Sequence, residues 1–141
     1  MKVTDTSLRK GQDGPVKAIS PPAGGTAVDE VRVELQERSY PVHIGVGLFS
    51  QSGRMLRESG IEGRICLVST PKVFELYGEK VRESLAAAGY DVVVESVPDG
   101  EEAKSLATAE RLYDRALACG LDRTSTYVAL GGGVVGDVTG F

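Results

Sequence analysis

The stretch that decides the fold is Tyr127-Val128-Ala129-Leu130-Gly131-Gly132-Gly133-Val134-Val135-Gly136-Asp137. Its first four residues are an apolar run that predicts a buried strand, and glycines follow that run at once. The glycines satisfy the spacing G-x-G-x-x-G, in which residues without side chains let backbone N–H groups approach a phosphate. A helix that starts after them would add its partial positive charge. This mechanism predicts nucleotide or phosphate binding, although Asp137 could equally be a turn or cap residue.

The segments before this motif alternate between strands and helices. Short apolar runs at 65–68 and 92–94 predict two more strands, and apolar residues at helical spacing predict helices over 48–58, 71–88 and 101–118. The buried stripe expected on the last of these helices is Leu106, Ala109, Tyr113, Ala116 and Leu117. Such alternation implies a Rossmann-like α/β fold, with a mostly parallel sheet and helices on both faces.

A β-hairpin is predicted ahead of this α/β region. Val31, Val33 and Leu35 alternate with polar residues, and a second short strand passes through 40–44. His43 on that strand has no identifiable catalytic partner, so we expect a structural role for it. Residues 1–30 show no periodicity and little apolar content, which predicts a disordered extension, with an organellar transit peptide as the alternative.

Composition excludes several classes of function. The chain has 16 Lys and Arg against 20 Asp and Glu, for a net charge of -4, and carries no basic block, so nucleic acid is not an expected partner. No apolar run could span a membrane, and no signal peptide is apparent, so we expect a cytoplasmic protein. Cys66, Cys119 and His43 are too few for a zinc site, and Cys66 in its apolar strand is expected to be an inert core thiol.

A second loop, Pro98-Asp99-Gly100-Glu101-Glu102-Ala103-Lys104, follows the strand at 92–94. One interpretation is structural: Asp99 caps a helix, and Glu102 completes a capping box. The other is functional, because carboxylates there could accept hydrogen bonds from ribose hydroxyls while Lys104 reaches a phosphate. Both interpretations can hold together.

Three segments in order resemble the amino-terminal part of 3-dehydroquinate synthase, a member of the sugar-phosphate cyclase superfamily. They are Arg38-Ser39-Tyr40-Pro41-Val42, residues 98–106, and residues 129–141 with Thr139-Gly140-Phe141 at the end. The resemblance runs from Val31 to the last residue.

The resemblance implies which residues contact NAD. One NAD-contacting stretch would be Asp99, Gly100, Glu101, Glu102, Ala103 and Lys104, and the other Gly133, Val134, Val135, Gly136 and Asp137. A third contact would follow the strand at 65–68, where the family commonly has Asp or Asn. Thr70 stands there in the sequence Ser69-Thr70-Pro71, so it could bond a ribose hydroxyl but would bring no charge.

The resemblance also implies an activity and a domain arrangement. Such enzymes are carbon–oxygen lyases of the shikimate pathway to aromatic amino acids. They use NAD and a divalent metal, zinc or cobalt, to convert 3-deoxy-D-arabino-heptulosonate 7-phosphate to 3-dehydroquinate and phosphate. A helical second domain carries the metal ligands and most substrate contacts, so we assign no catalytic or metal-binding residue here. Residues 31–141 would be an NAD-binding domain truncated at its carboxyl end, before the helix that the glycine motif should open, and inactive alone. A complete enzyme would be a homodimer.

Two alternatives stay open. The chain could come from a related sugar-phosphate cyclase or a metal-dependent polyol dehydrogenase, both of which use a glycine-rich NAD loop. It could also be a nucleotide-binding module without catalysis.

Overall fold

The computed structural model describes residues 28–141, which divide after Val46 into two compact units, each described by itself. Residues 1–27, most of the predicted extension, lie outside the described residues. The first described strand, β1 (Asp29–Val33), begins two residues before Val31, where the predicted alternation starts. Its backbone ladder pairs Asp29 with Ile44.

The smaller unit is the predicted hairpin. Strand β1 pairs with antiparallel β2 (Tyr40–Ile44), and Val31 lies opposite Val42. His43 lies opposite Glu30, with 3.7 Å between Nδ1 and the carboxylate Oε2, a proximity that the sequence did not reveal. The antiparallel pairing of β1 with β2 confirms the predicted hairpin.

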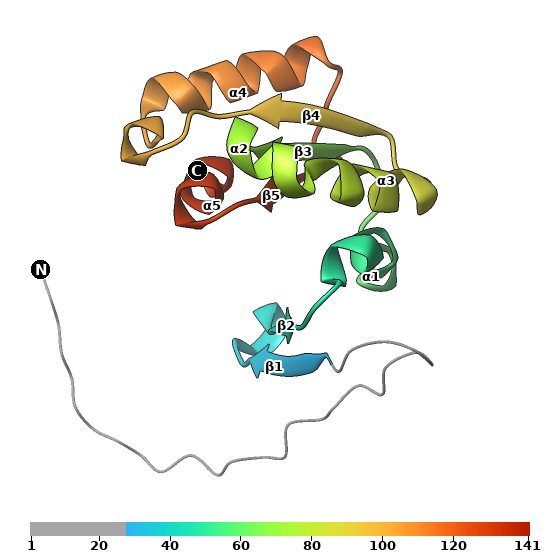
Figure 1. Cartoon of the computed structure of the whole chain (residues 1–141). Helices are drawn as coiled ribbons and strands as arrows, with labels where there is room; N and C mark the ends of the chain where they lie inside the picture. The colour runs from blue at the N-terminus through green and yellow to red at the C-terminus, as the bar shows by residue number, and fades with distance from the viewer. Residues whose placement is uncertain (1–27) are drawn as a thin grey trace, which may run out of the picture. The chain divides into compact units, whose positions relative to one another are not determined.

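The larger unit is built on a three-stranded parallel sheet in the order β4-β3-β5 (Figure 1). Its strands are β3 (Ile65–Ser69), β4 (Val92–Ser96) and β5 (Thr126–Leu130). Every residue of β3 is buried, as its uninterrupted apolar run predicts for a central strand covered on both faces.

Helices cover both faces of this sheet, which confirms the predicted α/β layers. Side chains of β3 alternate, so Ile65 and Leu67 pack with Leu85 of α3 (Glu79–Ala87), while Cys66 and Val68 pack against the opposite layer. The first layer also holds α1 (Ser52–Glu58), which contacts α3. A short α2 (Pro71–Val73) and a π-helical turn (Phe74–Gly78) lead into α3. The opposite layer contains α4 (Leu106–Ala118) and α5 (Gly133–Gly140).

Helix α4 begins later than the sequence predicts. Glu101–Ala103 form a separate 3-10 turn, and the helix is capped by Ser105, whose Oγ accepts a hydrogen bond from the Thr108 amide. The capping box predicted for Asp99 and Glu102 is therefore wrong, because a serine nearer the helix supplies the cap.

The buried face of α4 is also rotated from the predicted stripe. Ala109 and Ala116 are buried as expected, but Leu106 and Leu117 are each 74% exposed and Tyr113 is half exposed. The additional residues that face the sheet are Thr108 and Leu112. Alanines at 107 and 118 and leucine at 106 widen the apolar face, so spacing alone did not choose the correct stripe.

Helix α5 corrects the expectation that the helix of the glycine motif lies beyond the chain. It begins at Gly133, inside the motif, after an extended Gly132, and the Gly136 amide donates to the Gly132 carbonyl at 3.1 Å. Val135 and Val138 anchor it to the sheet. In Figure 1, α5 follows directly from the end of β5.

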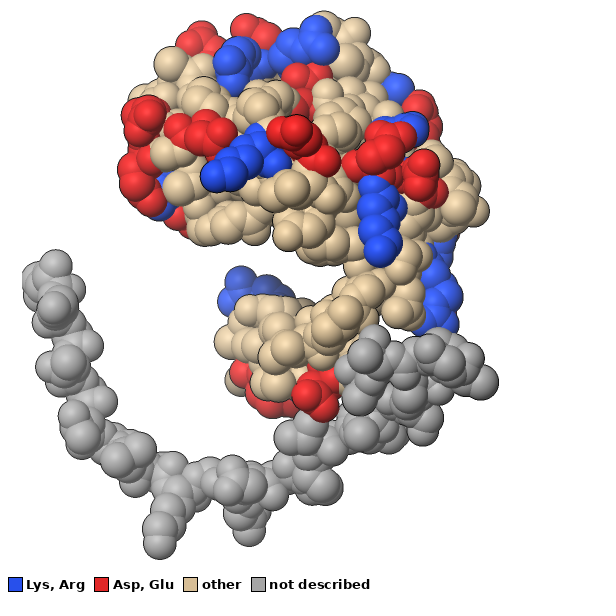
Figure 2. Space-filling view, in the orientation of Figure 1, with Lys and Arg blue, Asp and Glu red and all other residues tan. Residues whose placement is uncertain are grey.

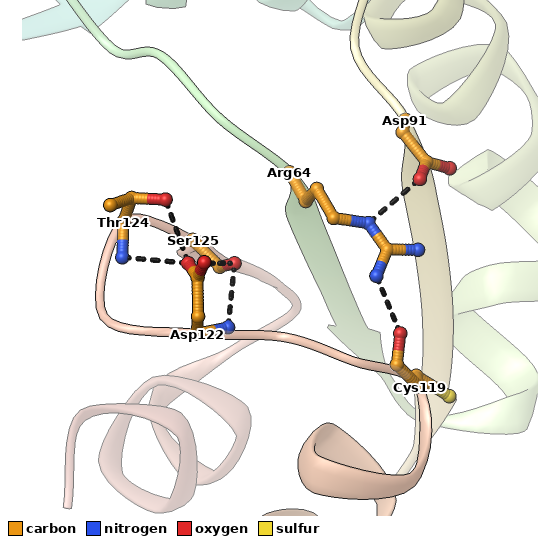
Figure 3. Close-up of polar contacts among 6 residues, drawn as sticks. All are labelled: Arg64, Asp91, Cys119, Asp122, Thr124 and Ser125. Atoms are coloured by element: carbon orange, nitrogen blue, oxygen red, sulfur yellow. Dashed lines mark hydrogen bonds and ion pairs between the residues drawn. The ribbon is translucent and has the colours of Figure 1, made fainter.

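At the opposite end of the sheet, Arg64 ties three segments together (Figure 3). Its Nε donates to Asp91 Oδ2 at 2.7 Å, and its Nη1 donates to the Cys119 carbonyl that ends α4. Asp122 closes the next turn by accepting hydrogen bonds from the Thr124 amide and hydroxyl. These contacts fix the amino ends of the strands, away from the loops of the glycine motif.

Figure 2 shows acidic and basic side chains interspersed on the visible face of the larger unit. None of the helices in residues 28–141 has the length and apolarity to cross a bilayer.

Candidate functional site

All the residues that the resemblance assigns to NAD follow the carboxyl end of a strand. Thr70 follows β3, residues 99–104 follow β4, and residues 133–137 follow β5. Because the three strands are parallel, these loops meet at one edge of the sheet, where open α/β folds bind ligands.

Lys104 connects the two longer loops. Its Nζ lies 2.8 Å from Glu101 Oε2 in its own loop and 2.9 Å from Asp137 Oδ2 in α5. Strands β4 and β5 are separated by β3, so the loops start about 10 Å apart, which is two strand spacings. Glu101 and Asp137 hold the pKa of the Lys104 ammonium above its usual value by hydrogen bonding. A charged lysine thus joins both predicted NAD-contacting stretches.

The loop at 99–104 presents carboxylates to solvent. Asp99, Glu101 and Glu102 are exposed, and Gly100 adopts a φ of 95°, a conformation that favours glycine. Ala103 is wholly buried beneath them. The carboxylates are available to hydroxyl groups of a ligand, whereas Ala103 supports the loop from below.

The glycine loop contains glycines of two kinds. At Gly131 a Cβ would lie 2.6 Å from Val135 Cγ2, so the packing of the chain itself requires this glycine. At Gly132, Gly133 and Gly136 a Cβ would meet nothing within 4 Å, and none of the three has a positive φ. The internal packing gives no reason for these three glycines. Open space beside their backbones suits the close approach of an external group.

Two further residues assigned to NAD are, like Ala103, buried rather than presented to a ligand. Thr70 is 5% exposed and caps α2, with its Oγ1 accepting from the Val73 amide at 3.4 Å. Val135 is 2% exposed and belongs to the core beneath α5. Val134 is partly exposed. In this conformation the accessible surface of the site comes from the glycines, the carboxylates and Lys104.

A cavity of about 280 Å³ adjoins the Lys104–Asp137 ion pair. Its lining is mostly apolar and comes from Lys104, Ser105, Leu106, Ala109, Asp137, Val138 and Phe141. Ligand pockets usually enclose about 300–1,000 Å³, so this cavity is near the lower end of that range, and Lys104 and Asp137 are the predicted NAD-contacting residues that line it.

Ser69 is a residue of this edge whose role sequence reasoning missed. Its hydroxyl donates to the Leu130 carbonyl at 2.7 Å, and the residue is 1% exposed. The signal in the sequence was a small polar residue at the end of the apolar run 65–68.

Cys66 lies in the core of the larger unit and is 1% exposed. Burial raises the pKa of the Cys66 thiol to about 11, which confirms the expected inert core cysteine. Residues 28–141 bring together no group of three or more His, Cys, Asp and Glu side chains that could hold a metal.

Comparison with solved structures places the fold in a class. A structure of 2-deoxy-scyllo-inosose synthase matches with a TM-score of 0.69 and 23% identity, covering 79% of this chain and 31% of that one. A second structure of that synthase, complexed with carbaglucose-6-phosphate, NAD+ and Co2+, matches with a TM-score of 0.67 and 25% identity over 79% of this chain and 30% of that one. The chain therefore has the α/β fold found in sugar-phosphate cyclases.

Comparison of sequences finds similarity to one particular family. Residues 94–141 match the family described as 3-dehydroquinate synthase N-terminal. A 3-dehydroquinate synthase of Pelotomaculum thermopropionicum is 54% identical over 114 residues, which are 81% of this chain and 31% of that protein. One from Picosynechococcus is 46% identical over 110 residues, which are 78% of this chain and 30% of that protein. The chain is therefore similar to the amino-terminal part of 3-dehydroquinate synthases and spans about three-tenths of the length of these relatives.

Proposed function

We propose that residues 31–141 form the NAD-binding region of a 3-dehydroquinate synthase. The observation that carries the proposal is the ion pair between Lys104 and Asp137, because it unites two loops that reach the same edge from non-adjacent strands. Those loops contain eleven of the twelve residues that the resemblance assigns to NAD, and Thr70 is the twelfth.

Different residues of the two loops are suited to bind different chemical groups of the cofactor. A Cβ at Gly132 or Gly133 would meet open space, so a pyrophosphate could approach the backbone at the start of α5, where it would gain from the helix dipole. Lys104 supplies the cation beside them. The exposed carboxylates of Asp99, Glu101 and Glu102 are suited to accept hydrogen bonds from ribose hydroxyls.

NAD fits the donor set, because the loops combine side-chain-free backbone, one lysine and several exposed carboxylates. When bound, NAD accepts a hydride from a ring alcohol of the substrate and later returns it. The residues described here bind and orient the cofactor, and none of them is assigned a proton transfer.

The reaction of the whole protein is part of the proposal. The substrate would be 3-deoxy-D-arabino-heptulosonate 7-phosphate and the products 3-dehydroquinate and phosphate, as the names of the sequence relatives and the resemblance support. A homodimer in the cytoplasm, with no nucleic-acid partner, stays a prediction from the sequence.

The described residues contain no cluster of three or more His, Cys, Asp and Glu side chains that could hold a metal. Zinc or cobalt in a complete enzyme would take its ligands from outside residues 28–141. The Co2+ in the structure of 2-deoxy-scyllo-inosose synthase supports a divalent metal in this superfamily.

Two measurements test the proposal. Calorimetry of this chain with NAD, with ADP as a fragment control, should show binding that Gly136→Ala weakens. A chimaera should then be made in which this chain replaces the matching 114 residues of the Pelotomaculum relative. We expect NAD-dependent phosphate release from the shikimate-pathway substrate. A folded chimaera that binds NAD but releases no phosphate would contradict the proposed reaction.

A related cyclase activity is the second candidate, favoured by the structural match to 2-deoxy-scyllo-inosose synthase. The 54% identity to a 3-dehydroquinate synthase outweighs the 25% identity to that cyclase. The substrate contacts of the chimaera come from the relative, so the two candidates are separated by assaying the complete protein that contains this chain with glucose 6-phosphate and with the shikimate-pathway substrate. A nucleotide-binding module without catalysis predicts NAD binding with neither substrate consumed.

A further inference from the structure

Ser69 occupies the last position of the central strand and contacts both flanking strands where they end. Its Oγ donates to the Leu130 carbonyl at 2.7 Å, and Leu130 is the last residue of β5, directly before Gly131. Its own carbonyl accepts from the Val97 amide at 2.9 Å, one residue beyond the end of β4. One buried residue is therefore bonded to the start of both cofactor loops.

The two bonds differ in what they require. The bond from Val97 uses backbone atoms and is open to any residue at position 69. The bond to Leu130 needs a side-chain hydroxyl, which extends the pairing between β3 and β5 at their last paired residues, Ser69 and Leu130. Ser69 is 1% exposed, so if its hydroxyl were removed, water could not replace that donor without a rearrangement.

We propose that Ser69 is a positioning residue that fixes where the glycine loop leaves the sheet and so sets its distance from the loop at 99–104. Lys104 spans the two loops at their outer ends, through Asp137. Ser69 fixes their inner ends, so the pyrophosphate-binding backbone is held from two sides. This role rests on the proposed NAD site.

The test uses this chain with Ser69→Ala and Ser69→Thr, with Tyr90→Phe as a matched control. Tyr90 also donates a hydroxyl hydrogen bond of 2.7 Å to a backbone carbonyl, that of Ile61, but it precedes β4 at the opposite end of the sheet. Ser69→Ala and Tyr90→Phe each remove one hydrogen bond from a hydroxyl to a backbone carbonyl. If Ser69 had only a structural role, the two variants should change the Kd for NAD to a similar extent.

We expect Ser69→Ala to raise the Kd for NAD about tenfold, equivalent to about 1.4 kcal/mol. Ser69→Thr keeps the hydroxyl, so its Kd for NAD should stay within about threefold of that of the parent chain. The remaining difference comes from the extra methyl group in the packed interior. Tyr90→Phe should lower the unfolding temperature without changing the Kd. An unchanged Kd in Ser69→Ala, or an equal change in Tyr90→Phe, would overturn the proposal.

Amide hydrogen exchange without ligand separates this inference from the NAD proposal. If Ser69 positions the loops, Ser69→Ala should speed exchange at 131–137 while Tyr90→Phe leaves those amides unchanged. Failure of the parent chain to bind NAD would contradict the proposed function alone. Unchanged exchange in Ser69→Ala would contradict the positioning role, whatever the ligand.

Discussion

Lys104 Nζ lies 2.9 Å from Asp137 Oδ2, and this ion pair connects the loop after β4 to the helix after β5. The two residues are 33 positions apart in the sequence, and the strand between their parent strands is β3. Loss of Lys104 should therefore affect the relation between the loops as well as the charge offered to a phosphate.

Lys104→Met should raise the Kd for NAD about tenfold or more, the effect of losing one charge-assisted hydrogen bond and leaving Asp137 uncompensated near the phosphates. Lys104→Arg keeps the charge and should recover part of the affinity. Calorimetry at two salt concentrations measures this loss. Arg54→Met, which breaks an exposed ion pair with Glu58, is the control and should leave NAD affinity unchanged. Equal affinities in Lys104→Met and the parent chain would remove Lys104 from the cofactor site.

Glycines 136 and 131 should respond to alanine in opposite ways. At Gly136 a Cβ meets open space inside α5, so Gly136→Ala should stabilise the chain by up to about 1 kcal/mol through helix propensity, while it weakens NAD binding by obstructing the backbone. At Gly131 a Cβ would lie 2.6 Å from Val135 Cγ2, so Gly131→Ala should destabilise the chain by about 1–3 kcal/mol.

Urea unfolding and calorimetry of the two glycine variants measure these effects. The informative result is the combination of higher stability and weaker NAD binding in Gly136→Ala. If Gly136→Ala binds NAD as well as the parent chain does, the open space beside α5 does not receive the cofactor.

The sequence was sufficient to predict the layers of the fold because local patterns determine them. The apolar run of β3 predicts burial on both faces, and period-2 alternation then assigns Ile65 and Cys66 to opposite layers. The start of α4 was missed because three candidate caps, Asp99, Ser105 and Thr108, lie within ten residues, and local propensity does not rank them.

The site could be predicted only in part for a related reason. Both predicted NAD-contacting stretches stand out in the sequence by composition, but their meeting depends on strand order, which follows from packing of the whole sheet. The bonds of Lys104 to Asp137 and of Ser69 to Leu130 join residues 33 and 61 positions apart. No local pattern contains such pairs.

Arg64 offers a test of stability that is separate from the site. Its guanidinium donates hydrogen bonds to Asp91 and to the carbonyl of Cys119 at the end of α4 (Figure 3). Its positive charge also interacts favourably with the negative end of the helix dipole. Arg64→Met should lower the free energy of unfolding by about 1 kcal/mol, a value reduced by the partial exposure of the pair. NAD affinity should not change, because these contacts lie at the amino ends of the strands. A loss of affinity comparable to that of Lys104→Met would show that the two ends of the sheet are coupled.

Cys66 should make the chain lose stability as the solution becomes alkaline. Burial raises the pKa of its thiol to about 11, whereas the pKa of a cysteine in an unfolded chain is about 8.5. Between these values the unfolded state has released its proton and the folded state has not, so the free energy of unfolding falls as pH rises, by at most about 1.4 kcal/mol per pH unit. Below about pH 8 the contribution of the buried thiol to the free energy of unfolding is fully present.

Urea unfolding from pH 7.5 to 10.5 measures how the free energy of unfolding changes with pH, with Cys66→Ala and Cys119→Ala compared with the parent chain. Cys66→Ala should flatten the slope even though it lowers stability at every pH, and Cys119→Ala should retain it. If all three proteins give parallel curves, the thiol of Cys66 does not govern the alkaline transition.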